Sequence, residues 1–242
     1  MAKPLSLEKI LFSQGFGTRR YCSDLVYAEL VKVNGTLAED PEEKISPEGA
    51  VLTVDGQDWE YHEKAYIAFN KPTGYECSHK TSHHPSIYGL LPQPLIERGI
   101  QCVGRLDFDT TGLILMSDDG QFIHKMTSPK KNIGKIYEIT CADSLTQKQL
   151  DHLINGVVLD DDPKPCFATA CQQLDDKKLA MTIVEGRYHQ VKRMMAAVGN
   201  HVAELHRSVI GEYTMPKNLE PGTWRWLYPD DLKQLGKSIS SK

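Results

Sequence analysis

Apolar and polar residues follow helical spacing at the start of the chain and strand spacing soon after. Leu7, Ile10 and Leu11 fall on one helical face. After a Gly-Phe-Gly break, Thr18 suits the N-cap of a second helix, because its hydroxyl can accept a free backbone N–H. Residues 31–35, Val-Lys-Val-Asn-Gly, alternate and end in a dipeptide typical of tight turns. The pattern predicts two helices followed by a strand.

The remainder of the chain combines short apolar runs with turn residues. Strands are expected at 66–70, 135–139, 179–184 and 201–206, and helices at 143–155 and from 189 onward. In the last helix an apolar stripe follows the spacing i, i+3, i+4 and i+7, at Val191, Met194, Met195 and Val198. Residues 57–64 are polar and charged without apolar periodicity, so we expect a linker there.

Length and composition describe an ordinary globular protein. The chain has 242 residues, 40% hydrophobic and 25% charged, which suits one large or two small domains. No apolar run approaches the roughly 18 residues that a membrane helix needs, and the N-terminus lacks the apolar core of a signal peptide. The six cysteines form no C-x-x-C pair, which favours reduced thiols. We therefore expect a cytoplasmic protein with no membrane partner.

Charge is distributed unevenly, although the formal net charge is only −4. Residues 1–35 carry five basic and three acidic side chains, whereas residues 36–63 carry nine acids against Lys44. The helices of the first segment are therefore expected to present a basic face. Such a face suits nucleic acid, while the overall acidity argues against a general nucleic-acid coat protein.

The most informative stretch is residues 104–115, Gly-Arg-Leu-Asp-Phe-Asp-Thr-Thr-Gly-Leu-Ile-Leu. Asp107 and Asp109 stand two apart beside apolar residues, although Asp is depleted in strands and rarely buried without a partner. Local conflicts of this kind tend to mark functional sites. The alternative is an ordinary loop whose carboxylates and threonines bind nearby backbone. The composition of the stretch leaves both interpretations open.

The full string is more specific than its composition. Gly-Arg-Leu-Asp-x-x-Thr-Thr-Gly-Leu closely resembles the central motif of the RsuA/RluA superfamily of pseudouridine synthases. Three further strings resemble other motifs of that family: Asn-Lys-Pro-x-Gly at 70–74, Lys-x-Tyr at 135–137, and Gly-Arg-Tyr-His-Gln-Val-Lys-Arg at 186–193. The resemblance extends from about residue 5 to about residue 232.

By that resemblance Asp107 is the catalytic nucleophile, and the basic residue after His-Gln-Val pairs with it. This residue is Lys192 by position, with the adjacent Arg193 as the alternative. Tyr137 is expected to hold the target base outside the RNA helix, a task that stacking on a ring suits. Arg105 is expected to hold phosphate or to fill the space that the base leaves.

The N-terminal segment resembles an S4-type RNA-binding domain, with a leading helix, Gly-x-Gly-x-Arg-Arg, a second helix and Val-x-Val-Asn-Gly. By that resemblance Arg19, Arg20 and Lys32 contact RNA phosphates, which position the RNA without reading its sequence. The alternative is a solvated basic helix face. Further RNA contacts are expected in the synthase motifs, at Lys71, Arg187 and Arg193.

Together the resemblances imply an α+β fold. They place a small S4-like domain at 1–60, a catalytic domain with a mixed, largely antiparallel sheet at 61–235, and a flexible tail at 236–242. Pseudouridine formation detaches a uracil, turns it and rejoins it through carbon, so it requires no cofactor or metal in principle. The adjacent His83 and His84 have no Cys or carboxylate near them at ligand spacing, so we expect solvated loop histidines.

Within the family, Tyr188 and His189 favour the branch that acts on small-subunit (16S) ribosomal RNA. Relatives that act on large-subunit (23S) RNA, the alternative substrate, usually carry other residues there. The acidic balance favours a partly assembled small-subunit particle over naked RNA as the partner. We expect the protein to act as a monomer.

Two other classes of protein compete with this interpretation. Asp107-Phe-Asp109-Thr-Thr fits the Asp-x-Asp-x-Thr loop of haloacid-dehalogenase-type phosphatases, which hold Mg²⁺. However, Gly104 and Arg105 interrupt the apolar strand that such a loop needs, and an alternating parallel α/β pattern is missing. The non-enzymatic alternative is an S4-domain ribosome assembly factor without catalysis, against which the intact synthase motifs argue.

Overall fold

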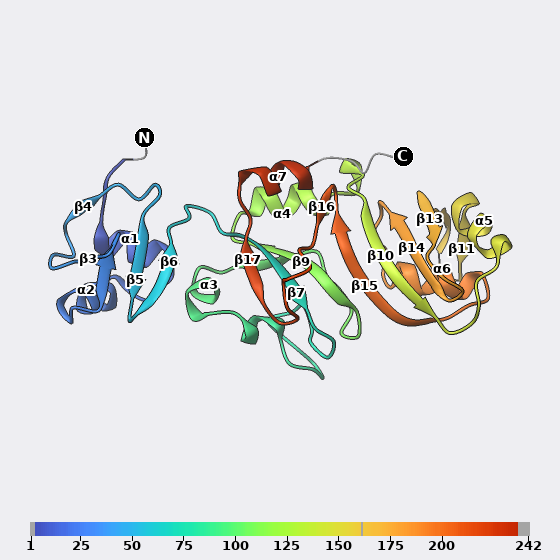
Figure 1. Ribbon diagram of the computed structural model, residues 1–242, viewed down its shortest axis with the longest axis horizontal. Coiled ribbons are helices and arrows are strands. Elements are labelled where there is room, and N and C mark those ends of the chain that lie inside the picture. Colours follow the sequence, from blue (N-terminus) through green and yellow to red (C-terminus); the bar gives the residue numbers. More distant parts are fainter. Residues whose placement is uncertain (1–2, 161, 237–242) are drawn as a thin grey trace. The chain divides into compact units, whose positions relative to one another are not determined.

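The chain folds into two compact units in the computed structural model, which describes residues 3–160 and 162–236 (Figure 1). The first unit combines residues 1–65 with 91–101, and the second combines residues 66–90 with 102–242. Residues 91–101 thus return to the first unit, which differs from the sequential division at residue 60 expected from the sequence. The expected tail at 236–242 lies outside the described residues from 237 onward.

Short helices and a four-stranded sheet form the first unit. The predicted helix pair is confirmed as α1 (Leu7–Ser13) and α2 (Arg19–Tyr27), and the Thr18 hydroxyl caps α2 by accepting the Tyr21 N–H. The sheet order is β3-β2-β5-β6, formed by β2 (Val31–Val33), β3 (Thr36–Leu37), β5 (Val51–Val54) and β6 (Gln57–Glu60). A strand pair and one further helix complete it: β1 (Leu5–Ser6), β4 (Lys44–Ile45) and α3 (Gln93–Glu97).

The linker predicted at 57–64 is wrong in its first half, because Gln57–Glu60 is strand β6. The preceding Asp-Gly dipeptide has positive φ at both residues, 48° and 76°, which makes a tight turn and folds β6 back on β5. Trp59 is 9% exposed and packs edge-on against Phe16. A single buried ring in four residues gives no periodicity that would identify a strand.

A nine-stranded sheet forms the body of the second unit, in the order β13-β14-β10-β15-β9-β7-β17, with β16 beside β15 and β8 beside β9 (Figure 1). Its strands are β7 (Tyr66–Lys71), β8 (Gln101–Val103), β9 (Thr111–Ser117), β10 (Lys135–Cys141), β13 (Ala170–Gln173), β14 (Lys178–Ile183), β15 (Val202–Ile210), β16 (Tyr213–Thr214) and β17 (Trp224–Trp226). Antiparallel pairs dominate, while β15 pairs in parallel with β9. The predicted α+β class with a mixed, largely antiparallel sheet is therefore confirmed.

Strands β7 and β9 are buried on both faces and form the centre of this core. Residues 67–69 and 113–116 are almost completely buried, which explains their unbroken apolar runs. Helices α4 (Gly120–Thr127) and α7 (Pro229–Leu235) add Met126 and Leu235 to the same core. The remaining elements are the helices α5 (Gln147–Asn155) and α6 (Gln190–Ala197), the strands β11 (Val157–Leu159) and β12 (Asp162–Cys166), and the 3-10 turns η1 (Ile87–Leu90) and η2 (Pro129–Lys131).

Helix α6 matters most for the site. Its predicted apolar stripe is confirmed, since Val191, Met194 and Met195 are buried. The helix begins one residue later than expected, because His189 is the N-cap and has a left-handed backbone (φ 48°). In the part of the chain that the structure describes, no helix has the length and apolar character needed to cross a membrane.

Candidate active site

The two aspartates of the central motif lie in the loop between β8 and β9, and Asp107 lines a large cavity. Two features hold this loop against the sheet. A Cβ on Gly112 would lie 2.4 Å from the carbonyl oxygen of Arg207, so only glycine allows β9 and β15 to approach this closely. The Thr110 N–H also donates to the Asp107 carbonyl oxygen (3.1 Å), which closes a turn around the carboxylates.

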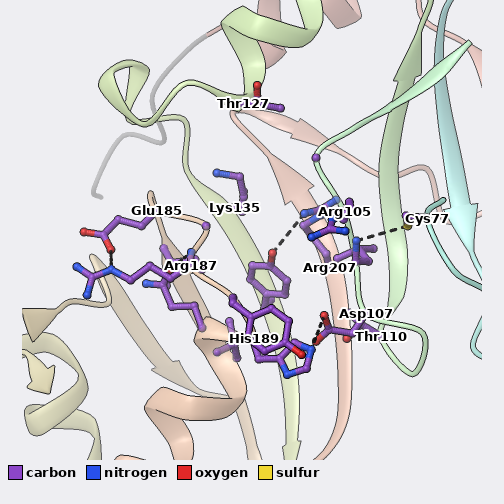
Figure 2. Close-up of a pocket in the computed structure, with 18 of the residues that line it drawn as sticks. Cys77, Arg105, Asp107, Thr110, Thr127, Lys135, Glu185, Arg187, His189 and Arg207 are labelled. Atoms are coloured by element: carbon purple, nitrogen blue, oxygen red, sulfur yellow. Dashed lines mark hydrogen bonds and ion pairs between the residues drawn. The ribbon is translucent and has the colours of Figure 1, made fainter. Parts of the chain in front are cut away.

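Helix α6 and its N-cap supply two side chains that contact Asp107 at opposite oxygens. Nε2 of His189 lies 3.2 Å from Oδ1, and Nζ of Lys192 lies 3.2 Å from Oδ2 (Figure 2). Lys192 also donates to Oδ1 of Asp109 (2.6 Å). Arg193 instead donates to the main-chain carbonyl of Tyr188 (3.0 Å). Of the two basic residues left open by the sequence, the structure therefore brings Lys192 to Asp107.

The lysine bridge shifts the pKa of Lys192 and that of Asp109 toward the charged form of each group. Partial burial lowers the pKa of Lys192, but the hydrogen bonds and charges of Asp109 and Asp107 raise it by more than burial lowers it. The pKa of Lys192 is therefore raised above its usual value. Partial burial raises the pKa of Asp109, but the hydrogen bond and charge of Lys192 outweigh this effect and lower it. The result is a cation held between two carboxylates.

Lys71 does not lie where an RNA contact would need it, and this expectation is corrected. Its side chain is fully buried. Nζ donates to the carbonyl oxygens of Pro72 (3.0 Å), Phe108 (3.1 Å) and Thr110 (2.9 Å). A buried ammonium group needs such acceptors. Lys71 therefore fixes the loop that carries the aspartates.

The cavity beside these groups has a volume of about 680 Å³, within the usual range for ligand sites. Tyr137 lines it, as do Asp107 and Lys192. Tyr137 stands opposite Arg207 in the pairing of β10 with β15 and is only 8% exposed. Its ring is thus a wall of the cavity as well as part of the core.

Arg207 lies beneath that wall. It is 3% exposed, and it donates from Nε to the Leu113 carbonyl (2.8 Å) and from Nη1 to the Tyr137 hydroxyl (3.3 Å). Its guanidinium carbon is 5.8 Å from the centre of the Tyr137 ring. From the sequence Arg207 is expected to face RNA, but this expectation is wrong, because the side chain is buried and supports the tyrosine instead.

Arg187 is a second expected RNA contact, and its side chain is engaged within the protein. Its guanidinium donates to carboxylate oxygens of Glu185 (2.7 Å) and Asp162 (3.0 Å), and to the carbonyl oxygens of Lys164 (2.6 Å) and Pro165 (3.1 Å). The contacts with Asp162, Lys164 and Pro165 fasten the loop before α6 to strand β12, and Figure 2 shows the pair that Arg187 forms with Glu185. A phosphate would compete with these contacts, so they give Arg187 a structural role, and its expected contact with RNA stays a prediction.

The other predicted basic residues are placed as follows. Arg105 is exposed and lines the same cavity as Asp107. In the first unit, Arg19, Arg20 and Lys32 are exposed on α2 and β2, and the Arg19 guanidinium lies over the Phe12 ring at 5.5 Å. These three basic side chains are therefore accessible, and their contact with RNA stays a prediction.

Sequence reasoning missed the contact of His189 with Asp107. The available signal was its place at the start of a motif helix, but only the left-handed turn at His189 directs the ring toward the carboxylate. The phosphatase alternative fits the site poorly, because the Lys192 ammonium bridges the two carboxylates that would share Mg²⁺. Among the described residues, no group of three or more His, Cys, Asp or Glu side chains is arranged to hold a metal ion.

Comparisons with known proteins agree with this site. The RNA pseudouridylate synthase family matches residues 65–197. Ribosomal small subunit pseudouridine synthase A of Haemophilus influenzae is 36% identical over 96% of this chain and 100% of its own length, and that of Escherichia coli K12 is 35% identical over 94% and 98%. A crystal structure of a pseudouridylate synthase is 36% identical, covers 96% of this chain and 99% of its own, and superposes with a TM-score of 0.68. The match spans more than half of the chain, the relatives align along nearly all of it, and the motif resemblance is confirmed: the chain belongs to the RNA pseudouridylate synthase family.

Proposed function

We propose that the protein converts a specific uridine of small-subunit (16S) ribosomal RNA into pseudouridine, with the Asp107 carboxylate as the nucleophile. The observation that carries the nucleophile is that both oxygens of Asp107 are held, by His189 and Lys192, at the edge of a cavity large enough for a nucleotide. The small-subunit target is supported by the names of the relatives and by Tyr188 and His189 in the third motif.

Asp107 must remain ionised, close to the reacting ribose or base, and poorly solvated. Lys192 supplies a cation 3.2 Å from Oδ2, which offsets the cost of partly burying the carboxylate. His189 fixes the other oxygen, which reduces the freedom of the carboxylate before reaction. The contacts are therefore those that a preorganised nucleophile requires.

The base must be held while it is detached and turned. Tyr137 offers a ring in the cavity wall for this purpose, and Arg207 keeps that ring in place from behind. Arg105, exposed at the same cavity, is suited to bind a phosphate of the flipped nucleotide or to occupy the space left in the RNA.

The first unit adds affinity for RNA through Arg19, Arg20 and Lys32, in the manner of an S4-type domain. Because the chain has a net charge of −4, a partly assembled small-subunit particle suits it better than naked RNA. We further propose that the protein works as a monomer in the cytoplasm.

The test uses purified protein and Asp107→Asn, each incubated with small-subunit particles and with large-subunit RNA that lack the modification. Pseudouridine is mapped by carbodiimide-dependent primer extension. One new stop in small-subunit RNA, absent with Asp107→Asn, is the expected result. The variant should still fold and bind RNA, because asparagine keeps the size of the side chain.

The other results separate the alternatives. Product only in large-subunit RNA would keep the chemistry and overturn the target. Equal product from Asp107→Asn would exclude Asp107 as the nucleophile. RNA binding without product in either RNA would favour an assembly factor, and Mg²⁺-dependent hydrolysis of a phosphate ester would then test the phosphatase alternative.

A further inference from the structure

Lys135 is a cation of the cavity that the proposed reaction has not yet used. It stands two residues before Tyr137 on β10, so both side chains point to the same face of the sheet, and both line the cavity. In Figure 2, Lys135 lies across the cavity from Asp107 and His189. The hydrogen bond of its Nζ is to the main-chain carbonyl of Ile133 (3.1 Å).

The charges around this lysine are unbalanced. Among the described residues no carboxylate pairs with Lys135, and the charged group that acts on it most is another cation, Arg207. Burial and that neighbouring charge lower the pKa of Lys135 to about 8. Two cations beside each other in a half-buried cavity are costly without an anion. Such a conflict indicates a place prepared for negative charge.

The negative charge must come from the part of the RNA that can reach this position. Arg207 and Tyr137, the neighbours of Lys135, line the cavity and are only 3% and 8% exposed, so the wall that they form is the inner end of the cavity, its floor. A backbone phosphate is joined to the RNA strand on both sides, so it stays near the rim of the cavity, where Arg105 is exposed. The base of a flipped nucleotide has no such continuation and can enter to the floor.

We propose that Lys135 is a catalytic residue that binds a carbonyl oxygen of the target uracil and stabilises the negative charge of the base while it is detached from the ribose. Arg207, held behind Tyr137, supports the same charge from the floor of the cavity. The inference rests on the proposed function for the choice of RNA and for Asp107 as the nucleophile.

The electron count fits this role. When the bond between C1′ and N1 breaks, its electron pair leaves with the uracil, whose two carbonyl oxygens share the negative charge. C1′ is left electron-poor, and the Asp107 carboxylate lies on the other side of the cavity to receive it. Later C5 bonds to C1′ with an electron pair of the base, and the bond between C1′ and the Asp107 oxygen breaks and returns its pair to the carboxylate. C5 then loses its proton, and N1 gains one. Lys135 donates a hydrogen bond and undergoes no net change.

The test compares Lys135→Met and Lys135→Arg with unaltered protein in single-turnover reactions at saturating enzyme. Methionine keeps the length of the side chain without its charge. We expect Lys135→Met to lower the rate constant about a hundredfold, as loss of one charge-stabilising donor does, and to leave the RNA dissociation constant within about twofold. Lys135→Arg should recover most of the rate.

Lys130→Met is the matched control, because Lys130 is exposed on η2, five residues away, and does not line the cavity. It should leave the rate constant unchanged. An unchanged rate for Lys135→Met, or a loss confined to RNA affinity, would overturn the proposal, and the latter would assign Lys135 to a phosphate. The target is tested separately by the product that unaltered protein forms. The rate comparison uses whichever ribosomal RNA the unaltered protein modifies, small-subunit or large-subunit. If the unaltered protein modifies neither RNA, both proposals are overturned.

Discussion

The ammonium group of Lys192 lies 3.2 Å from Oδ2 of Asp107, although the two residues belong to different motifs. The same ammonium group lies 2.6 Å from Asp109, so one cation serves both carboxylates. Because helix α6 is anchored by its buried stripe, Lys192 reaches the loop from a rigid base. The pairing of nucleophile and cation therefore depends on how α6 packs in the second unit.

Lys192→Met should lower the rate constant for pseudouridine formation by about a hundredfold or more, because Asp107 loses the cation that lies against its carboxylate. Lys192→Arg should retain part of the activity, since the charge remains. The control is Arg193→Met, which removes the adjacent basic side chain that bonds to the Tyr188 carbonyl. Equal losses in Lys192→Met and Arg193→Met would contradict the pairing seen here.

The variant Asp109→Asn distinguishes the role of Asp109 from that of Asp107. It removes the charge that shares Lys192 but leaves both contacts of Asp107. We expect product to form at a reduced rate, whereas Asp107→Asn should form none. Rates are measured at saturating RNA by primer extension. If Asp109→Asn formed no product and Asp107→Asn stayed active, Asp109 rather than Asp107 would be the nucleophile.

Lys71→Met should destabilise the fold, because three carbonyl oxygens around a fully buried site lose their donor. We expect the free energy of unfolding to fall by about 3 kcal/mol or more. Urea denaturation followed by tryptophan fluorescence measures it. Lys130→Met is again the surface control. Unchanged stability combined with weaker RNA binding would restore Lys71 to the RNA contacts expected from its motif.

Lys135→Met should raise the melting temperature at pH 7, even though it lowers activity. Burial and Arg207 lower the pKa of Lys135 to about 8 in the folded state, below the value of about 10.4 in an unfolded chain. Below pH 8 Lys135 is protonated in both states, but the proton binds less favourably in the folded state, so the charged lysine lowers the free energy of unfolding. This cost disappears as pH rises from about 8 to about 10.4. Calorimetry should show a smaller difference in melting temperature between Lys135→Met and unaltered protein at pH 9.5 than at pH 7. Equal melting temperatures at pH 7 would contradict this prediction.

Arg19→Glu/Arg20→Glu should weaken RNA binding and reduce its dependence on salt, by roughly one unit of slope for each phosphate that the arginines no longer neutralise. Chemistry on a bound minimal substrate should change less. Binding is measured by filter retention from low to high salt. Arg187→Gln is the informative comparison, since its guanidinium is engaged within the protein and its removal should leave the salt slope nearly unchanged. An unchanged slope in the double variant would remove Arg19 and Arg20 from the RNA face.

By itself the sequence determined the features that depend on near neighbours. The Thr18 cap, the apolar stripe of α6 and the strand at 66–70 follow from local spacing, and each is present in the structure. The aspartate motif identified the centre of the site, because a pair of carboxylates beside apolar residues is a local conflict. The position of the carboxylates could therefore be predicted from short stretches of chain.

Only the tertiary structure decided what each basic side chain contacts. Lys71 and Arg187 turn inward to carbonyl and carboxylate oxygens, whereas Lys192 reaches Asp107. The return of residues 91–101 to the first unit is also absent from any local pattern. The physical reason is that a lysine or arginine carries the same charge in a solvated face, a buried clamp or an active site. Its role is set by the acceptors that distant segments bring to it, and those segments meet only in the folded chain.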